Sequence, residues 1–283
     1  MTDENWAQAT ADPLATAAGP WLPDAVAVVA GGGLSGPAGG VGFAIAWLCA
    51  RNGARVAVLD RDAACAERAV AAIRAAGGDA EAFTVDVTDD DSVRRTIAAV
   101  HERFGRIDVL ADSIGGGSVR SLLDVGPEEF HAALDLNFMS AWSLIRHAQP
   151  HLRRGGAIVT ISSGAAEGRG PGTPYGVAKT ALEKLTLGAA GSLAERGIRA
   201  NCVRVGMIWG AFAARGMSEE QREVRRRNVA LQTEGNVWDI ASAAFFLCTA
   251  QARWISGHVL PVDGGGFAIS NRGQAGGTDD EEG

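Results

Sequence analysis

The stretch Ala25–Gly42 reads AVAVVAGGGLSGPAGGVG and runs directly into the helix-forming sequence FAIAWLCARNG. Its first part, Ala25–Ala30, is a short apolar run that ends in glycines, as is typical of a strand buried on both faces of a parallel sheet. A glycine-rich turn between such a strand and a helix brings backbone N–H groups and the helix N-terminus against a pyrophosphate. Gly36, Gly40 and Gly42 supply this turn, so the stretch predicts a pyrophosphate-binding strand–turn–helix unit.

The next strand strengthens this interpretation because it ends in an acid. Arg55–Asp60 reads RVAVLD, a second buried strand. A carboxylate at this place can hold both hydroxyls of an adenosine ribose. Asp60 can also cap the helix that begins near Arg61, and the two roles are compatible.

Strands and helices alternate along the rest of the chain. Further strands are expected at Glu81–Val85, Ile107–Ala111, Ala157–Ile161, Arg199–Val203 and His258–Val262. Helices are expected after the glycine turn and over residues 61–76, 90–104, 127–152, 175–196 and 237–249. This alternation implies right-handed crossovers and a parallel sheet with helices on both faces, which is the doubly wound α/β class.

One domain is expected, because no linker rich in Pro or Ser divides the sequence. It covers residues 23–268 and includes an excursion over 206–236 that we expect to form a lid over the substrate. Residues 1–22 show no clear period and are expected to form a mobile arm, or a strap over a neighbouring subunit. Residues 269–283 end in DDEEG and are expected to be an acidic disordered tail.

Composition argues against several kinds of partner. The 283 residues carry a net charge of −7, with a pI of about 5.3, which disfavours nucleic acid and anionic membrane. The N-terminus lacks the basic-then-apolar order of a signal peptide, and no run of about 18 apolar residues suggests a membrane span. The four cysteines are scattered without a C-x-x-C pair, and no carboxylate or cysteine completes a metal set beside His147 and His151. We therefore expect a cytoplasmic protein without a metal.

A second constellation lies near the middle of the chain. Tyr175 is the only tyrosine, and Lys179 is one of two lysines. They stand four residues apart in a segment rich in helix formers, so the phenol and the ammonium can point into one site. Such a pair alone is more often an exposed tyrosine and a solvated lysine, but the upstream Ser163 and the glycine turn favour a shared site.

Short motifs recur along residues 24–266. They are GVGFAIA after the glycine turn, VAVLDRD, DVTD from Asp86, IDVL, LDLNFMSAW around Asn137, IVTISS to Ser163, YGVAK from Tyr175 and GHVLPVDGG near the C-terminus. With these motifs the chain resembles the short-chain dehydrogenases/reductases over nearly its whole length. The resemblance implies a Rossmann-type, doubly wound parallel seven-stranded sheet in the order 3-2-1-4-5-6-7, with helices on both faces.

The resemblance also implies four catalytic positions. Tyr175 would act as general acid/base on the substrate oxygen, and Lys179 would lower the Tyr175 pKa and bond the nicotinamide ribose. Ser163 would hydrogen-bond the substrate oxygen, and Asn137 would hold a water that links Lys179 to solvent. Ser162 stays open as a substitute, because Ser163 stands twelve residues before Tyr175, one fewer than in many relatives.

By the same resemblance the cofactor is NAD. The positions expected to bind it are Gly31, Gly36, Gly40, Val41, Gly42, Asp60, Arg61, Asp86, Val87, Asp112, Gly115, Tyr175, Lys179, Gly206 and Ile208. A 2′-phosphate would meet the Asp60 carboxylate at close range, so NAD should be preferred over NADP. Arg61 is the one candidate cation next to this acid, and the glycine turn itself contains no Lys or Arg.

Three departures from the family pattern are present. Gly40-Val41-Gly42 arrives five residues late, so an insertion lies inside the phosphate loop and the first glycine of the motif is undecided. Asp112 begins Asp-Ser-Ile-Gly where the family usually has N-N-A-G. Residues 205–210, VGMIWG, replace P-G-x-I-x-T and lose a threonine hydroxyl.

These patterns predict an NAD-dependent enzyme that interconverts a secondary alcohol and a ketone. One alternative is a 3-oxoacyl-carrier-protein reductase whose acidic carrier docks on the basic run Arg222–Arg227, a run that can equally be the solvated face of a helix. A rival of another class is a catalytically silent nucleotide-sensing protein. Trp209, Phe212 and Met217 either line an apolar substrate pocket or pack as a lid on the core.

A homotetramer is expected as well. The resemblance implies that the helices beginning at Pro127 and near Tyr175 pair with their mates in neighbouring subunits. Residues 188–191, Gly-Ala-Ala-Gly, would allow close approach between backbones, although such a face also packs inside one subunit.

Overall fold

A computed structural model of the chain describes residues 20–36, 39–117, 120–168, 172–209, 218–227 and 229–266. Within these residues a seven-stranded sheet has the order β3-β2-β1-β4-β5-β6-β9, and all neighbouring strands are parallel. Its strands are β1 Val26–Ala30, β2 Arg55–Asp60, β3 Asp79–Thr84, β4 Ile107–Asp112, β5 Leu152–Ser163, β6 Arg199–Val205 and β9 Val259–Val262. The predicted fold class and strand order are confirmed, with β9 as the seventh strand.

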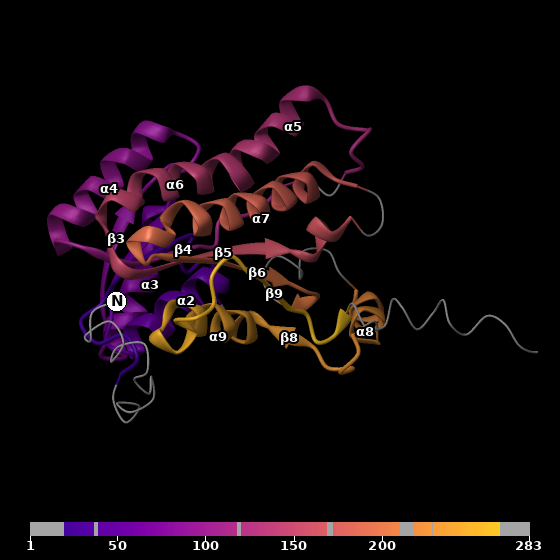
Figure 1. Ribbon diagram of the computed structural model, residues 1–283. Helices are drawn as coiled ribbons and strands as arrows, with labels where there is room; N and C mark the ends of the chain where they lie inside the picture. The colour runs from indigo at the N-terminus through magenta and orange to yellow at the C-terminus, as the bar shows by residue number, and fades with distance from the viewer. Residues whose placement is uncertain are drawn as a thin grey trace, which may run out of the picture.

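Helices cover both faces of this sheet (Figure 1). They are α2 Val41–Arg51, α3 Ala63–Ala75, α4 Asp90–Phe104, α5 Pro127–Leu134, α6 Ser140–Ala148, α7 Pro174–Leu193, α8 Glu219–Arg227 and α9 Val237–Cys248. The helices α4, α5, α6 and α7 lie on one face, and α2 and α9 lie on the other. No helix in the described part of the chain is both long and apolar enough to cross a membrane.

The side chains of β1 alternate between two hydrophobic cores, as a strand buried on both faces requires. Val26 and Val28 pack with residues of α4, α6 and α7, whereas Ala27 and Val29 pack with residues of α2, α3 and α9. All four side chains are fully buried. The apolar run Ala25–Ala30 therefore contains a strand that contributes side chains to the cores on both faces of the sheet.

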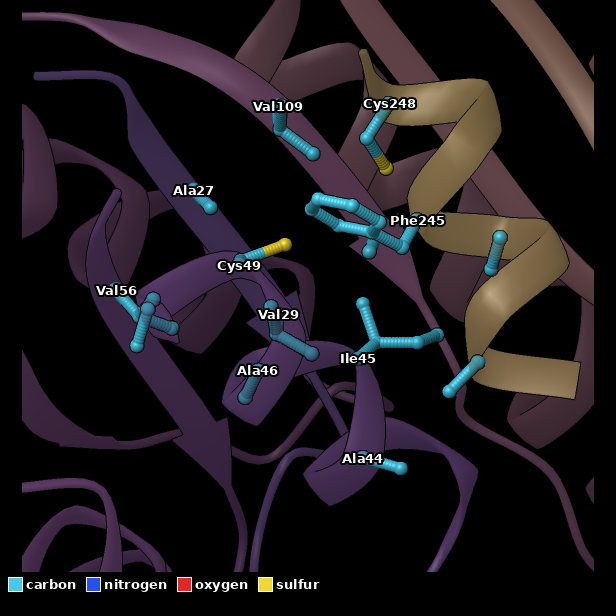
Figure 2. Close-up of a cluster of buried hydrophobic side chains, with 14 of the residues drawn as sticks. Ala27, Val29, Ala44, Ile45, Ala46, Cys49, Val56, Val109, Phe245 and Cys248 are labelled. Carbon is cyan, nitrogen blue, oxygen red and sulfur yellow. The ribbon is translucent and has the colours of Figure 1, made fainter. Parts of the chain in front are cut away.

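Figure 2 shows the core that joins α2 to α9. Cys49 of α2 faces Phe245 and Cys248 of α9, and both thiols are free and buried. A hydrogen bond with Cys248, together with burial, raises the pKa of the Cys49 thiol well above its ordinary value. Both cysteines therefore act as small apolar core residues, and burial keeps Cys49 in its thiol form.

The region between β6 and α9 contains structure that the sequence analysis did not predict. Two short parallel strands, β7 Ile208–Trp209 and β8 Gly235–Asn236, form a second sheet beside α8. Asn236 begins α9 by accepting the Trp238 N–H at 2.8 Å, and its own N–H is bonded by Asp239. Residues 210–217 and 228, with Phe212 and Met217, lie outside the described residues.

The end of the predicted N-terminal arm packs against this body. The Trp21 ring stacks on Phe245 with centroids 5.9 Å apart, and Leu22 is buried. The Leu22 N–H donates to the Asn52 carbonyl at 2.9 Å. Residues 1–19, and the acidic tail at 269–283, lie outside the described residues.

Candidate active site

A cleft of about 700 Å³ opens at the carboxyl ends of β1, β4, β5 and β6. Parallel α/β sheets bind their ligands at this edge. Of the predicted site residues, those that line the cleft are Gly31, Gly40, Val41, Gly42, Asp60, Gly115, Ser163, Tyr175, Lys179, Gly206 and Ile208. Those that do not line it are Gly36, Arg61, Asp86, Val87, Asp112 and Asn137.

Two glycines form the turn between β1 and α2. Gly31 has a φ of +72°, and a Cβ on Gly42 would lie 2.1 Å from the Gly31 carbonyl oxygen. Only glycine allows this close approach of helix and turn. Gly40 is the N-cap of α2, and nothing lies within 4 Å of the position that its Cβ would take. The turn is thus built on Gly31, Gly40 and Gly42, whereas Gly36 lies in the insertion.

The insertion lies over the start of α3. Leu34 N–H donates to the Cys65 carbonyl at 2.9 Å, and the Arg68 guanidinium donates to the Leu34 carbonyl at 3.1 Å. A Cβ on Gly33 would lie 2.4 Å from the Asp60 carboxylate, so this position also requires glycine. Arg68 is therefore a cation beside the phosphate loop that the sequence analysis missed, because it comes from the next helix.

The Asp60 carboxylate is fixed by backbone donors. One oxygen accepts the Gly33 N–H at 3.1 Å, and the other accepts the Asp62 N–H at 3.1 Å. The N-cap of α3 is Asp62, whose carboxylate accepts the Cys65 N–H at 3.1 Å. Asp60 therefore lines the cleft without capping the helix, and each oxygen keeps a lone pair for a further donor.

Asp86 and Val87 lie after β3, away from the cleft. The Asp86 carboxylate accepts both the Thr88 N–H at 3.0 Å and the Thr88 hydroxyl at 2.6 Å. These bonds hold the pKa of Asp86 below its ordinary value. Val87 is buried among apolar residues, and Arg61 is exposed.

The hydroxyls of Ser162 and Ser163 point in opposite directions because adjacent residues of a strand alternate. Ser163 lines the cleft, and its Oγ accepts the Ala165 N–H at 3.2 Å. Ser162 also lines the cleft, but its hydroxyl donates to a Glu183 carboxylate oxygen at 2.8 Å. Ser163 also hydrogen-bonds Tyr175. The structure therefore brings Ser163, and not Ser162, to Tyr175.

Burial raises the pKa of Tyr175, and the hydrogen bond with Ser163 opposes this only in part. The sequence analysis expected the opposite direction, with Lys179 lowering this pKa. The Lys179 Nζ lies 5.8 Å from the Tyr175 ring centroid and donates elsewhere. In this structure the phenol of Tyr175 is therefore kept in its neutral form.

Lys179 is buried between two strand ends. Its Nζ donates to the carbonyl oxygens of Ile114 and Ile161, each at 2.9 Å. A Cβ on Gly115 would lie 3.1 Å from the same Nζ, so glycine leaves the space that the ammonium needs. Burial lowers the pKa of Lys179, and the Asp112 charge opposes this.

Asn137 holds the loop that follows β4. It lies in a π-helical turn, Asp135–Met139, which interrupts the long helix predicted over 127–152. Its amide donates to the carbonyls of Gly116 and Ala133 at 2.8 and 2.9 Å, and its oxygen accepts the Gly116 N–H at 3.0 Å. π-Turns are frequent at functional sites because they redirect one side chain.

Asp112 is the last residue of β4 and is buried. Its carboxylate accepts the Ile114 N–H at 3.0 Å. Burial raises the pKa of Asp112, whereas the positive charge of Lys179 lowers it. The acid that replaces the family amide thus lies beside the site lysine.

The wall on the substrate side contains residues that the sequence analysis did not select. They include Gly164, Ala165, Glu167, Met207, Arg225, Val229 and Asp263. Arg204 of β6 binds Glu167 at 2.6 Å and Glu183 at 2.6 Å, which ties the segment after Ser163 to the sheet. Met207 and Asp263 stand in the segments VGMIWG and GHVLPVDGG, but these motifs do not show which of their residues face the cleft.

Two groups of candidate residues have other contacts. Trp209 does not line the cleft, and the Arg222 guanidinium lies 4.1 Å from its ring centroid. His147 contacts the Asp90 carboxylate at 2.9 Å, whereas the His151 ring stacks on His101 with centroids 4.1 Å apart. The two histidines of the possible metal pair therefore face different neighbours.

The cleft residues fit a dinucleotide. Gly40 begins α2 without a side-chain cap in the described structure, so the helix N-terminus faces the cleft, and Gly42 permits close approach of a pyrophosphate. A carboxylate stands at the end of β2, while a hydroxyl, a phenol and an ammonium meet at the end of β5. Fold and site together define a Rossmann-type oxidoreductase.

Comparison with known proteins identifies the family. The family model described as "Enoyl-(Acyl carrier protein) reductase" matches residues 36–266. The chain is 32% identical over 241 residues to 7alpha-hydroxysteroid dehydrogenase of Escherichia coli, which covers 84% of this chain and 94% of that protein. It is 35% identical over 243 residues to L-rhamnose 1-dehydrogenase (NAD(P)(+)) of Azotobacter vinelandii, which covers 83% and 95%. The chain belongs to the short-chain dehydrogenase/reductase family.

A solved structure gives the same result. The crystal structure of a dehydrogenase/reductase from Sinorhizobium meliloti superposes with a TM-score of 0.80 at 32% identity. The superposition covers 87% of this chain and 96% of that one.

Proposed function

We propose that this protein is an NAD-dependent oxidoreductase that interconverts a secondary alcohol and a ketone. The observation that carries the proposal is the meeting of Ser163, Tyr175 and Lys179 in one cleft with the glycine turn. Residues used only for packing have no need of a buried ammonium beside a phenol in an open cleft, since an isolated buried charge is costly.

Each site residue has a definable part in the reaction. When bound, NAD would supply the hydride acceptor for alcohol oxidation, and NADH the hydride donor for ketone reduction. Ser163 donates a hydrogen bond to the substrate oxygen and fixes it beside Tyr175. Tyr175 gives its phenolic proton to that oxygen during reduction and removes it during oxidation. The positive charge of Lys179 favours the phenolate that forms when Tyr175 has given up its proton.

NAD is proposed over NADP because Asp60 is held at the cleft edge. A 2′-phosphate there would meet a carboxylate already fixed by two backbone donors. Arg61 follows Asp60 directly, and Arg68 lies beside the phosphate loop, where its guanidinium donates to the Leu34 carbonyl.

The substrate body is proposed to be apolar. Val205, Met207, Ile208 and Val229 line the same cleft as Tyr175. The carrier-protein alternative requires free cations on the basic run of α8. Three of its arginines already contact carboxylates, Arg222 with Glu234 and Arg226 and Arg227 with Glu223. An acidic carrier would have to displace these contacts, which disfavours that alternative.

Turnover tests the proposal against the silent-sensor alternative. Purified protein is incubated with NAD and a panel of cyclic, aliphatic and hydroxyacyl secondary alcohols, and with NADH and the matching ketones. Reduced nicotinamide is followed by its absorbance. We expect turnover with at least one apolar alcohol. Saturable NAD binding by calorimetry without turnover of any panel member would favour the sensor.

The chain without cofactor should titrate its tyrosine above the ordinary pKa of about 10. Burial raises the pKa of Tyr175, and it is the only tyrosine, so tyrosinate absorbance reports this residue alone. Alcohol oxidation, which needs the phenolate, should accelerate as the pH rises, whereas ketone reduction should proceed at neutral pH. A tyrosinate midpoint below about 9 would show that Lys179 outweighs burial.

A homotetramer is proposed from exposed faces on two helices. Val177, Gly188 and Gly191 share one face of α7 by helical spacing, and no atom lies near the two glycine Cβ positions. On the neighbouring segment Met139 and Trp142 are also exposed. Light scattering at micromolar concentration should give about four times the 29.2 kDa chain mass. Gly188→Arg should lower this mass without unfolding the chain, and a wild-type monomer would contradict the proposal.

A further inference from the structure

Two buried side chains of opposite charge are tied to one residue of the loop after β4. Asp112 and Lys179 are each only 2% exposed. The Asp112 carboxylate accepts the N–H of Ile114 at 3.0 Å. The Lys179 ammonium donates to the carbonyl of the same Ile114 at 2.9 Å. The backbone N–H of Ile114 therefore holds the Asp112 carboxylate, and its carbonyl oxygen holds the Lys179 ammonium.

Asp112 is the one carboxyl group among the groups that act on Lys179 in the described structure. The other groups are Cys202 of β6 and Tyr175 on the same helix. Burial raises the pKa of the Cys202 thiol to about 11, so this thiol is neutral under ordinary conditions. Glu183 faces Cys202, but its carboxylate is held in an ion pair by an arginine of β6. The positive charge of Lys179 is thus balanced from β4.

We propose that Asp112 is a positioning residue that keeps Lys179 in its charged form. A lysine buried without a counter-ion releases its proton readily, because a low-dielectric interior penalises the ammonium. The carboxylate offsets this penalty, which the amide usual in the family at this position cannot do. The consequence for catalysis rests on the proposed function, since an uncharged Lys179 would no longer favour the Tyr175 phenolate.

The charge of Lys179 can be measured directly, because the chain has only two lysines. Protein labelled with 13C at the lysine ε-carbon is titrated by NMR, and Lys184→Arg assigns the two signals. In the wild type, Lys179 should be protonated at neutral pH. Asp112→Asn should lower the Lys179 pKa by about 1 unit or more and leave Lys184 unchanged. A neutral Lys179 in the wild type, or an unshifted Lys179 in the variant, would overturn the proposal.

Asp108→Asn is the matched control. Asp108 lies in the same strand and is nearly buried, but it pairs with Arg106 and accepts the Val26 N–H at 2.8 Å. This substitution should leave the Lys179 pKa unchanged. An equal shift of the Lys179 pKa in Asp108→Asn would mean that removing either carboxylate of β4 has the same effect. This result would contradict a specific role of Asp112.

A second variant keeps the proposal testable when Asp112→Asn does not fold. In the double variant Asp112→Asn/Lys179→Met the uncompensated ammonium is absent, and methionine fills the space of the lysine stem. The double variant should unfold at a higher urea concentration than Asp112→Asn alone. A double variant that is no more stable toward urea than Asp112→Asn would show that the Lys179 charge does not cause the loss of stability.

These measurements are separate from turnover. The expected Lys179 shift in a protein that turns over no substrate would support the counter-ion and contradict the proposed function. Turnover by the wild type together with an unshifted Lys179 pKa in Asp112→Asn would support the proposed function and contradict the counter-ion role of Asp112.

Discussion

Tyr175→Phe is expected to abolish turnover while leaving the fold and cofactor binding nearly intact. The substitution removes one hydroxyl and keeps the ring in its partly buried position above Lys179. Loss of a general acid/base alone slows a reaction by about 10²–10⁴-fold, and loss of coupling to Lys179 adds to this. The measurement is kcat with the best substrate of the panel, alongside NAD affinity and thermal unfolding. Retention of more than about a tenth of the wild-type rate would place another group in this role.

The two neighbouring serines provide a matched pair for this experiment. Ser163→Ala should also lower kcat, because the hydroxyl that reaches Tyr175 is lost. Ser162→Ala removes a hydroxyl bonded to Glu183 and should affect stability more than kcat. Equal loss of kcat in both variants would show that disturbed packing, and not the position of the hydroxyl, is the cause.

Asp60→Asn is expected to move the cofactor preference toward NADP by about 100-fold or more. Two like unit charges about 4 Å apart repel by about 4 kcal/mol at an effective dielectric near 20, and each 1.4 kcal/mol is about tenfold. Partial exposure of Asp60 reduces that figure. Without the carboxylate charge, Arg61 and Arg68 would be left to attract a 2′-phosphate. The measurement is the ratio of kcat/KM for NAD and NADP in wild type and variant.

Two further variants separate charge from loop support. Asp60→Ala removes the acceptor for the Gly33 N–H as well as the charge, so it should weaken both cofactors beyond the effect of Asp60→Asn. Asp62→Asn removes a nearby charge that caps α3 outside the cleft, and it should leave the preference unchanged. Equal or better use of NADP by the wild type would contradict the role given to Asp60.

The layered fold could be predicted from the amino-acid pattern alone. The buried run before the glycine turn and the strand Arg55–Asp60 follow from local hydrophobic pattern. The helix Asp90–Phe104 has the predicted bounds, because Asp89 caps its start and Gly105 ends it with a φ of +79°. These signals act over a few residues, so they can be detected without tertiary structure. The family motifs then supplied the strand order.

Which residues reach the cleft depends on how distant segments pack, and the sequence pattern does not show this. The sequence contains several glycines in and around the insertion, and it does not show which of them form the turn. In the structure a Cβ on Gly42 would lie 2.1 Å from the Gly31 carbonyl oxygen, so these two glycines form the turn and Gly36 does not. The pleat of β5 turned Ser163, and not Ser162, toward Tyr175.

The charges in the site could not be predicted from spacing either. The resemblance to the family implied that the Lys179 ammonium lowers the pKa of the Tyr175 phenol. In the structure Nζ donates to two carbonyls and the ring is buried, so the pKa rises. Asp112 is distant from Lys179 in the sequence, and the two residues come together only because α7 packs on β5, which is the neighbour of β4 in the sheet. Burial and the contacts of side chains from different strands set these pKa values, and both arise only when the whole sheet has formed.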